Sequence, residues 1–593
     1  MILQQLYQDA EAILGDNFAP PTYGFKPVRW EVCLKNDGSL IGIQSLGGDK
    51  DSKGGLPRLV PLPPPRSGTT VKACLLADSP AYVLGAALEE KEKRAQEKHT
   101  TFRALIQRCA RETSDSSVEA VGTFLSNWQN EAAALPDKMA AGDLVSFRVG
   151  EERPAEHPVV QAFWANENSL EGAGPVTNAQ CLVTGLHGPV ERILQQKING
   201  IPNGNPVGTA LLTADKLAFE SYGWQQARNS PISRVGAELS TKALNQLIRG
   251  ERTNVRMPGL VYVFWTNQGG DEDVSWALDR PEQVRDALQA VWTGKQSRAL
   301  QADAFYALAL SASGGRAVVR DWLNTTVGHV YDSLKRWFEA QEIVTHEGAR
   351  GPLLGVSQLA GAAYRDRKDM EPAVLQSLIR AALHGGPVPA HLLAKAVLRC
   401  RAEQRVTRPQ AALIKACLAT DPSFTEPEKE RYRLMSQLDA HQTDPAYLCG
   451  RLLAELEVVQ RAALGKTNTT LVDRYFGAAS TAPATVFGVL LTNANKAHLP
   501  KLRKTRPAVY QALQQRLEEI LAPGGPSGPG GMTHFPPTLT LREQGLFSLG
   551  FYHQRAADRK AAQEARERKD AALADLTSPD DGEDDATDEE NGD

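Results

Sequence analysis

One stretch without a single acidic side chain constrains this chain more than any other feature. It runs from Arg474 to Leu517 and contains seven Lys or Arg residues, five of them in KAHLPKLRKTR. Because like charges repel and no nearby acid neutralises them, we expect this segment to expose its cations rather than pack them. Exposed cations suit a phosphate backbone, since each neutralised phosphate releases a counterion. The residues predicted to follow such a backbone are Lys496, Lys501, Arg503, Lys504 and Arg506, and the alternative is a solvated basic face.

The net charge of −4 hides how basic the rest of the chain is. Ten acidic residues and no basic ones lie between Asp575 and Asp593, and without them basic side chains outnumber acidic ones. This tail is almost free of apolar residues, so we expect it to be disordered. It is interpreted as a solubilising tail, with a phosphate mimic that screens the basic body as the alternative.

Cysteine usage and hydropathy indicate an intracellular protein. The seven Cys form no CxxC pair and have an odd total, which argues against a disulfide framework or a zinc site and fits a reducing compartment. The N-terminus carries early acids and no basic n-region, and no run approaches the ~18 consecutive apolar residues of a membrane span. We therefore expect a cytoplasmic protein with no membrane partner and no cofactor.

Hydrophobic periodicity predicts alternating helices and strands in the first half of the chain. Residues 28–46 predict a β-hairpin, because two strand-like runs flank the turn Asn36-Asp37-Gly38. Two connections, 47–72 and 185–229, are rich in Gly, Pro or Asn and are predicted to be long irregular loops. Helices are expected at 1–16, 88–111 and 236–249, and further strands at 144–149, 181–185, 260–267 and 305–312.

The second half reads as successive helices, interrupted by a Gly/Pro insert at 522–537. The predicted fold class is therefore α+β, with a mixed α/β N-terminal part followed by an all-helical C-terminal bundle. The expected divisions are an α/β domain with a basic Pro-rich loop at 1–165, a second α/β segment with a Gly/Asn loop at 166–345, a helical connector at 346–442, the bundle at 443–565 and a disordered acidic tail at 566–593.

Three further sets of polar residues are candidate contacts to nucleic acid. The amide side chains in QQKINGIPNGN (195–205) can pair bidentately with adenine, and the pair Gly314-Gly315 would let backbone amides approach a phosphate. For each set a structural role is the alternative: a solvated loop, turn-forming Asn, or Arg paired with Asp321. The candidates are Lys53, Arg66 and Lys72 on the Pro-rich loop, Gln195, Gln196, Lys197, Asn199 and Asn203 on the Gly/Asn loop, and Arg316 and Arg320.

An enzymatic alternative rests on three acids. Asp271, Glu272 and Asp273 follow the strand-like run 260–267, where a metal-dependent nuclease can hold its ions. No HxH, HD or HExxH pattern supplies further ligands, and no GxxxxGK[ST] phosphate loop occurs, so an acidic turn is the preferred interpretation. A general single-stranded nucleic-acid binder is the other alternative.

Short blocks spread in order along the chain carry a family resemblance. They include MILQQLYQ at the start, CLVTGLHGPVERI at 181–193, ALALSASGGRAVVRDW at 307–322, DRYFGAASTAPATVF at 473–487 and LREQGLFSLGFYHQR at 541–555. Together they resemble the large subunit of the type I-C CRISPR surveillance complex, Cascade. The resemblance covers nearly the whole chain except the acidic tail and the Gly/Pro insert.

The resemblance implies a non-catalytic subunit that reads the protospacer-adjacent motif (PAM) on duplex DNA, helps separate the strands and holds the displaced non-target strand. Guide pairing would read the remaining sequence. The implied partners are crRNA, target double-stranded DNA, the Cascade backbone and crRNA-processing subunits, a recruited helicase-nuclease and a small subunit. The C-terminal bundle would resemble that small subunit, which in this subtype is typically an internally translated fragment of the same gene. This fragment is expected to start near Met435, just before the bundle, or at a later non-Met start codon.

Overall fold

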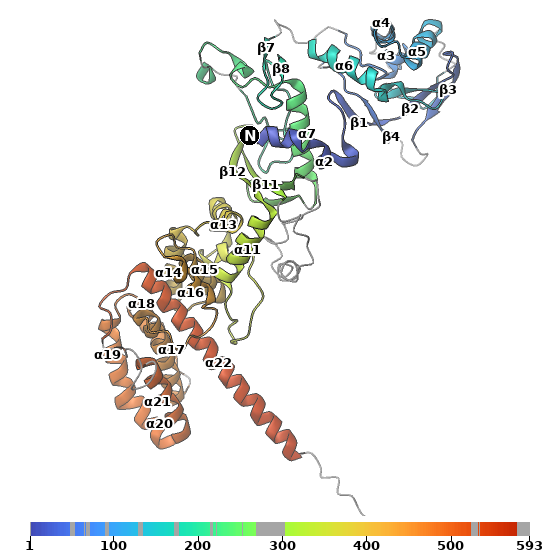
Figure 1. Ribbon diagram of the computed structural model, residues 1–593. Coiled ribbons are helices and arrows are strands. Elements are labelled where there is room, and N and C mark those ends of the chain that lie inside the picture. The colour runs from blue at the N-terminus through green and yellow to red at the C-terminus, as the bar shows by residue number, and fades with distance from the viewer. Residues whose placement is uncertain are drawn as a thin grey trace, which may run out of the picture. The chain divides into compact units, whose positions relative to one another are not determined.

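The computed structural model divides into two compact units, of which the first is mixed α/β and the second helical (Figure 1). The first comprises Met1–Glu272 and Tyr306–Trp322, and the second Asp273–Phe305 and Leu323–Asp593. This confirms the predicted α+β class, while the finer domain boundaries stay predictions. The structure describes residues 2–47, 54–64, 66, 71–88, 94–128, 135–170, 177–213, 217–220, 222–251, 253–267, 303–465, 467–522, 532 and 534–577.

A four-stranded sheet in the order β3-β2-β6-β5 forms the first layer of unit 1. Its strands are β2 (Trp30–Leu34), β3 (Leu40–Ser45), β5 (Ala77–Asp78) and β6 (Val145–Val149). The predicted hairpin is confirmed, since β2 pairs with β3 antiparallel and Gly38 adopts a φ of 84° in the turn. β2 also pairs in parallel with β6, and the core on this sheet includes side chains of α4 (Ala95–Thr113), α5 (Ser116–Asn127) and α6 (Pro158–Leu170).

The predicted 47–72 loop is partly wrong, because it contains a strand. β4 (Leu56–Pro61) pairs antiparallel with β1 (Tyr23–Val28) along six residues. The prolines of β4 hid this strand from the sequence patterns, because Pro cannot donate a hydrogen bond to a strand ladder. In a two-stranded ribbon the N–H groups on the outer edges are unpaired in any case, so Pro is tolerated there. Val28 and Val60 bury against Ala77, so the ribbon is attached to the first sheet by a small apolar cluster.

The second sheet of unit 1 has the strand order β12-β11-β10-β9. Helix α7 (Arg234–Arg249) contacts β9 and β10 of this sheet. α1 (Ile2–Gln8) and α2 (Ala10–Leu14) pack against α7. The predicted helix 1–16 is interrupted at Asp9, whose buried carboxylate accepts a hydrogen bond from Trp265 Nε1 at 2.9 Å. The strands are β9 (Asn254–Met257), β10 (Leu260–Thr266), β11 (Ala304–Ser313) and β12 (Arg316–Thr326).

The strand predicted at 181–185 is wrong, because these residues form the turn of a small hairpin. The hairpin joins β7 (Thr177–Gln180) to β8 (His187–Val190). Cys181 Sγ accepts backbone N–H groups of Val183, Thr184 and Ser233 at 3.2–3.4 Å, which curls the chain around the sulfur. Burial opposes ionisation of this thiol, but the hydrogen bonds from Ser233 and Thr184 outweigh it and lower its pKa to about 7.

Unit 2 is built of helices around α17 (Pro445–Leu464), which lies alongside α22 (Leu541–Thr577) (Figure 1). Gly450 and Gly550 sit where these two helices meet, and a Cβ on either would overlap a backbone carbonyl of the other helix. The remaining helices are α11 (Val327–Gln341), α12 (Val356–Ala362), α13 (Pro372–His384), α14 (Ala390–Glu403), α15 (Arg408–Ala419), α16 (Glu426–Leu434), α18 (Leu471–Ala479), α19 (Pro483–Asn493), α20 (Leu499–Thr505) and α21 (Pro507–Leu521).

α22 continues to Thr577, so the start of the predicted disordered tail is helical instead. The run is rich in Ala, Glu, Lys, Arg and Gln, which have high helix propensity, and this outweighs its lack of a continuous apolar face. Residues 578–593, with most of the predicted acidic tail, lie outside the described residues. No helix within the described ranges is both long and apolar enough to cross a membrane.

Candidate nucleic-acid interface

Within the acid-free segment, residues 483–505 form one continuous helical path with a local widening at its most basic part. α19 passes directly into a π-helical turn, η7 (Ala494–His498), and then into α20. Pro500 explains the turn, because proline has no N–H and its ring would clash with the carbonyl of residue 496 in a regular α-helix. π-turns of this kind are frequent at functional sites. The chain breaks again at Arg506, before Pro507 opens α21.

Opposite faces of this path carry apolar and cationic side chains. Leu499 and Leu502 are buried, which anchors α20 to the bundle. The five predicted cations Lys496, Lys501, Arg503, Lys504 and Arg506 are all exposed. Among the residues that the structure describes, no carboxylate pairs with any of them, and Arg506 donates only to the Ala462 carbonyl oxygen at 3.4 Å. We call these five residues the basic surface.

The electrostatics of the basic surface are visible in a neighbouring histidine. Partial burial, followed by the positive charge of Lys501, lowers the pKa of His498. A protonated His498 is therefore disfavoured, as expected where cations gather without acids. An anion bound here would relieve the same repulsion, because it neutralises the cations that no side chain neutralises.

Arg516 belongs to the same acid-free segment but points into the bundle. Its Nη1 lies 3.3 Å from Asp558 and 3.6 Å from Glu455, which is fully buried. Burial, together with the negative charge of Asp558, raises the pKa of Glu455 to about 7, and burial also raises the pKa of Asp558. Arg516 therefore balances the fully buried Glu455 and the half-buried Asp558, and is a structural residue.

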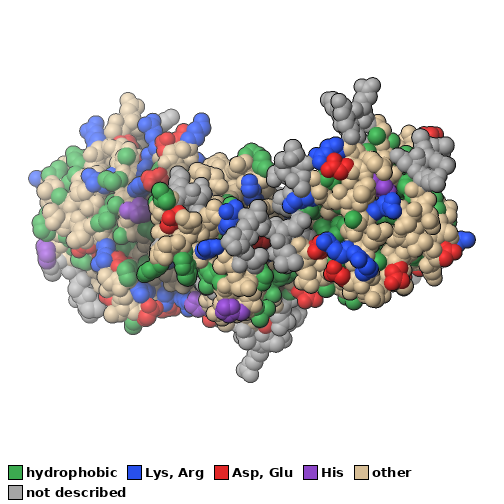
Figure 2. Space-filling view, turned by 90° about the horizontal axis from the view of Figure 1, so that it is seen from above, with side chains coloured by type: hydrophobic (Ala, Val, Ile, Leu, Met, Phe, Trp, Pro, Cys, Tyr) green, Lys and Arg blue, Asp and Glu red, His purple; other side chains and the backbone are tan. Residues whose placement is uncertain are grey.

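Acidic and basic side chains are mixed on one face of the molecule (Figure 2). In the face drawn in Figure 2, Lys and Arg side chains lie interspersed with Asp, Glu and hydrophobic side chains. Local freedom from acids, rather than a high number of cations, therefore distinguishes the basic surface.

The predicted Gly/Asn loop at 195–205 is held in one conformation by contacts from distant parts of unit 1. Ile198 is buried and pairs with Thr209 through two backbone hydrogen bonds of 2.8 Å. The Asn245 side chain of α7 accepts from Asn199 N at 2.8 Å and donates to Lys197 O at 3.0 Å. Arg256 Nη1 donates to Gly200 O at 2.8 Å. These contacts hold the backbone of the loop in one conformation.

The side chains of this loop differ in how far they are available. Gln195, Lys197 and Asn203 are exposed, and Asn203 has a positive φ of 59°, a conformation tolerated by Asn in turns. Asn199 is half-buried. Gln196 is also half-buried, and its side-chain carbonyl oxygen is buried with no hydrogen-bond partner among the residues that the structure describes. Gln195, Lys197 and Asn203 are therefore the members best placed to reach a ligand.

The structure brings this loop next to the predicted Gly-Gly-Arg site. Ala210, at the end of the loop, bridges to Arg316, with Ala317 N donating to Ala210 O at 2.8 Å. Arg316 is half-buried at the start of β12. Two predicted sites separated by more than a hundred residues in sequence thus adjoin, which local sequence patterns did not indicate.

Arg320 and Asp321, which sequence allowed to pair, point to opposite faces of β12. Arg320 is exposed and donates from Nε to Ser311 Oγ at 2.7 Å. Asp321 is buried and accepts from the Tyr262 hydroxyl at 3.1 Å. Strand alternation is the physical reason, because successive side chains leave a strand on opposite sides.

The candidate arginine of the Pro-rich loop, Arg66, is already bound by neighbouring groups of unit 1. Arg66 pairs with the buried Asp78, donates to Lys72 O at 2.9 Å and stacks 4.4 Å above the Tyr82 ring. Lys72 is half-buried. Lys53, the third predicted residue of this loop, lies outside the described residues. The contacts of Arg66 attach the loop to the domain.

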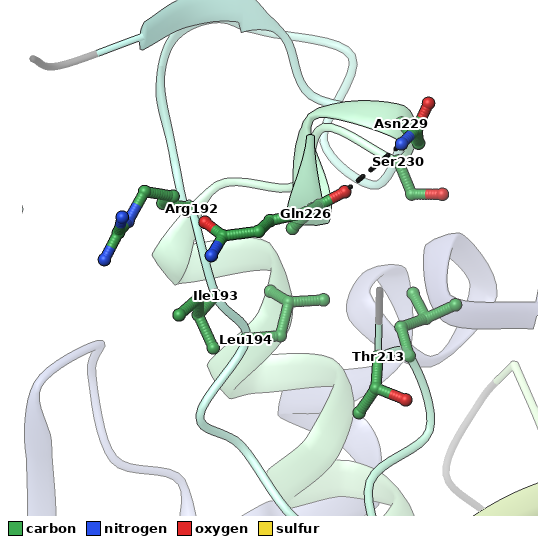
Figure 3. Close-up of a pocket in the computed structure, with 9 residues that line it drawn as sticks. Arg192, Ile193, Leu194, Thr213, Gln226, Asn229 and Ser230 are labelled. Carbon is green, nitrogen blue, oxygen red and sulfur yellow. Dashed lines mark hydrogen bonds between the residues drawn. The ribbon is translucent and has the colours of Figure 1, made fainter. Parts of the chain in front are cut away.

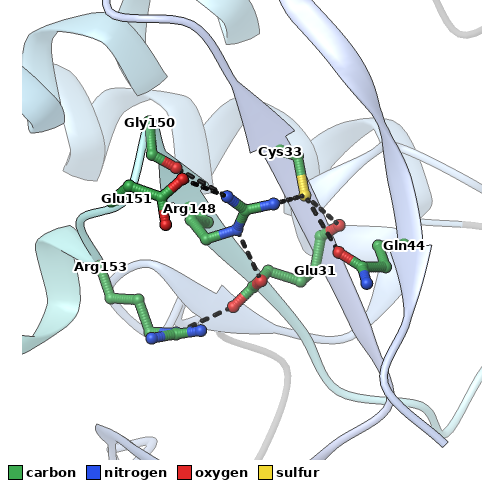
Figure 4. A network of polar contacts seen from close by, with 7 residues as sticks. All are labelled: Glu31, Cys33, Gln44, Arg148, Gly150, Glu151 and Arg153. Atoms are coloured by element: carbon green, nitrogen blue, oxygen red, sulfur yellow. Dashed lines mark hydrogen bonds and ion pairs between the residues drawn. The ribbon is translucent and has the colours of Figure 1, made fainter.

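A second arginine network, which sequence patterns did not reveal, supports the first sheet (Figure 4). Arg148 and Arg153 reach the Glu31 carboxylate with Nε–O distances of 3.1 and 3.0 Å, and Glu31 is buried. Arg148 also donates to Gly150 O at 2.7 Å and to Cys33 Sγ at 3.2 Å. Because these bonds satisfy a buried acid, we interpret the network as structural.

The nuclease alternative gains no support from the described ranges. No group of three or more His, Cys, Asp and Glu residues that could hold a metal ion occurs there. Asp271, Glu272 and Asp273, on which that alternative depends, lie outside the described residues. It therefore stays an untested alternative.

A pocket in the loop region 191–230 is a further feature that sequence patterns missed (Figure 3). It combines apolar side chains with Arg192, Gln226 and Asn229. The only sequence signal was the pair of aromatics in SYGWQQ, which lies in an otherwise Gly- and Asn-rich loop.

Comparison with known protein families gives a match along most of the chain. The family described as "CRISPR-associated protein (Cas_Csd1)" matches residues 3–558, which is nearly the whole chain. None of the curated proteins compared with the chain matches it.

Proposed function

This chain belongs to the Cas_Csd1 family of CRISPR-associated proteins, components of Cascade-type complexes, and we propose that it is the large subunit of a type I-C Cascade. In this role it reads the PAM on double-stranded DNA, aids duplex opening and R-loop formation, and holds the displaced non-target strand. It catalyses no reaction itself, and a helicase-nuclease recruited to the complex cuts the DNA. Base pairing to crRNA reads the remaining sequence.

The observation that carries this proposal is the basic surface on η7, α20 and the start of α21. Its five cations are exposed, have no acidic partner among the described residues, and stand on a helix that buried leucines anchor. A single strand needs an electropositive track whose side chains are not already neutralised. We therefore assign the displaced strand to this surface.

PAM reading is assigned to the Gly/Asn loop and the adjoining Arg316. Sequence is read by donors and acceptors at base edges, and Gln, Asn, Lys and Arg are the side chains suited to this. Gln195, Lys197 and Asn203 extend from a loop whose backbone is fixed by Asn245. A fixed backbone favours reading, because less conformational entropy is lost on binding.

Binding of the crRNA-loaded complex to matched duplexes that differ only in the flanking motif tests this assignment. The variant Gln195→Ala/Lys197→Ala should lower motif discrimination by about tenfold, since a good base contact contributes ~1–3 kcal/mol. Gln107→Ala/Arg111→Ala, which likewise removes one Gln and one cation but on the exposed face of α4, is the control and should leave discrimination unchanged.

Other outcomes of this experiment separate the alternatives. Loss of discrimination in Lys53→Ala/Lys72→Ala instead would move PAM reading to the Pro-rich loop; Arg66 is left intact because it holds Asp78. No motif preference in the wild-type complex would favour the general single-stranded nucleic-acid binder. Divalent-ion-dependent cleavage that disappears in Asp271→Ala/Asp273→Ala would favour the nuclease.

We also propose that the small subunit is an internally translated C-terminal fragment starting near Met435. Met435 lies at the end of α16, so such a fragment contains α17–α22 complete. It lacks α14 and α15, which cover α22 around Gly545 through Leu393 and Ile414. The fragment would therefore expose this face of α22 for another partner. Intact-mass measurement of the assembled complex that detects only the full-length chain would contradict the fragment.

A further inference from the structure

The loops around residues 192 and 226 enclose a small pocket of about 180 Å³ in unit 1. Ala227 N donates to Arg192 O at 3.1 Å, which ties the two loops together. The residues that matter for its chemistry are the apolar Ile193, Leu194 and Leu212 and the polar Arg192, Gln226 and Asn229. Figure 3 shows the Arg192 and Gln226 side chains extending toward the same end of the pocket. The volume suits one planar ring system and is below that of most pockets for drug-sized ligands.

The polar groups of the pocket fit a base and its phosphate. None of the lining residues is acidic. Arg192 and the nearby Arg228 are exposed and form no ion pair with an acid in the part of the chain that the structure describes. The Gln226 side-chain amide offers both a donor and an acceptor, the pattern that pairs with a base edge.

Two exposed aromatic residues precede the pocket-lining residue Gln226 closely in sequence. Trp224 is 53 % exposed and Tyr222 is 99 % exposed, although both side chains are large and mostly apolar. Asn229, which lines the pocket, donates from Nδ2 to Trp224 O at 2.9 Å and so fixes the Trp224 backbone. Exposed aromatics next to unpaired cations are the combination on which single-stranded nucleic acids stack.

The backbone of the same segment is strained. Tyr222 and Gln226 have positive φ angles of 53° and 56°, which non-glycine residues seldom adopt. Such conformations persist where the surrounding structure enforces them, and they cluster at ligand sites. Here the two strained residues bracket Trp224, so the strain sets the direction in which the Tyr222–Gln226 segment presents its side chains.

We propose that this pocket, with Tyr222 and Trp224, takes one unstacked nucleobase of an unpaired nucleic-acid strand, whose phosphates lie against Arg192 and Arg228. The inference rests on the proposed function and adds a base-capture site in unit 1 to the backbone track on α20. A docked protein chain is the competing occupant. Cations without acids and an amide aimed at a cavity favour a nucleotide, because a nucleotide carries both a negatively charged phosphate and a planar base.

Photocrosslinking of full-length chain to a single strand containing 5-iodouracil tests the proposal, because this base crosslinks to aromatic side chains on which it stacks. Wild type should crosslink within 222–224. Tyr222→Ala/Trp224→Ala should lose that crosslink and bind the strand about tenfold more weakly. Trp224→Phe, which keeps an aromatic ring at this position, should retain most of the wild-type binding. Ile41→Ala, which removes an apolar side chain that is 61 % exposed on β3 and does not line the pocket, is the control and should behave as wild type.

Separate arms identify the strand. A DNA strand and an RNA strand of the same sequence are compared, followed by the assembled complex with iodouracil in either the target duplex or the crRNA. A crosslink from the displaced DNA strand assigns the pocket to DNA, and one from crRNA assigns it to the guide.

Two results would overturn the inference. Crosslinks found only within 494–506, with motif discrimination of the complex intact, would remove the base-capture site and leave the proposed function standing. Protection of Trp224 from oxidation in the complex before any DNA is added, without a crosslink from crRNA, would show a subunit interface instead. If the chain binds no single strand at all, the strand-holding role in the proposed function fails as well.

Discussion

The basic surface of unit 2 and the loop region 191–230 of unit 1 present polar groups in opposite ways. On η7 and α20 the backbone hydrogen bonds of a helix and two buried leucines hold the cations, and these supports are local in sequence. In the loop region the supports are distant: Asn245 clamps residues 197–199, and Ala227 pairs with Arg192. A helix spaces charge evenly and suits a repetitive backbone, whereas a braced loop holds a few groups in one arrangement and suits a particular base.

Arg516 sharpens the contrast, because it belongs to the basic segment by sequence and to the core by position. It faces Glu455 and Asp558, while its neighbours on α20 face no acid in the described residues. The cations of the acid-free segment therefore have two roles: Arg516 is structural, and the five residues of the basic surface are available to a ligand. The predictions below test that division.

The largest effect is expected for Arg516→Ala. The change removes the nearest cation of the fully buried Glu455 and of the half-buried Asp558. Breaking a buried ion pair costs about 3–5 kcal/mol, and the partial exposure of Arg516 places this variant at the lower end of that range. Hydrogen exchange of the α17 and α22 amides in the full-length chain should show the loss of stability. Arg503→Ala, an exposed cation with no ion pair, is the control and should change these amides little. Equal effects of the two variants would break the comparison.

A slightly smaller effect is expected for Lys501→Ala/Arg503→Ala/Lys504→Ala/Arg506→Ala. Binding of single-stranded DNA should weaken by roughly a hundredfold at low salt, and the slope of log K against log salt should become less negative by about 3, since each single-strand phosphate contact contributes ~0.7. Folding should be unaffected, because all four side chains are exposed.

The control for this variant removes cations that lie among acids. Arg566→Ala/Arg568→Ala/Lys569→Ala changes exposed residues of α22 that are interspersed with Glu564, Glu567 and Asp570. Its salt slope should stay close to that of wild type. A slope that changes equally in both variants would mean that overall charge, and not the basic surface, drives binding.

The smallest effect concerns pH. The pKa of Glu455 in the folded chain, about 7, exceeds its ordinary value of 4.5, so the folded state binds this proton more tightly than the unfolded state. The resulting stabilisation is fully present below pH 4.5 and is lost as pH rises through 7. Glu455→Gln cannot ionise, so its stability should fall less between pH 5 and 7.5. Urea unfolding at a series of pH values measures this, and parallel curves for variant and wild type would refute it.

Sequence patterns predicted the elements whose cause is local. The hairpin at 28–46 follows from a turn sequence between two strand-like runs, and β10 follows from a run of β-branched and aromatic residues that the structure buries throughout. Sequence patterns failed where a group distant in sequence determined the local structure. The 181–185 segment became a turn around the Cys181 sulfur, which accepts the backbone N–H of the distant Ser233 as well as those of Val183 and Thr184. β4 was missed because its partner strand lies some thirty residues earlier.

The candidate site divides along the same line. The sequence alone determined that the five cations between Lys496 and Arg506 are exposed, since an acid-free run of cations cannot neutralise itself when packed. It also carried the family resemblance along nearly the whole chain. Only the tertiary structure decided that Arg516 and Arg66 turn to buried acids, that Arg316 adjoins the 195–210 loop, and that the 192 and 226 loops enclose a pocket. The physical reason is that each of these contacts joins residues distant in sequence or picks one partner among several, and local periodicity carries no information about either.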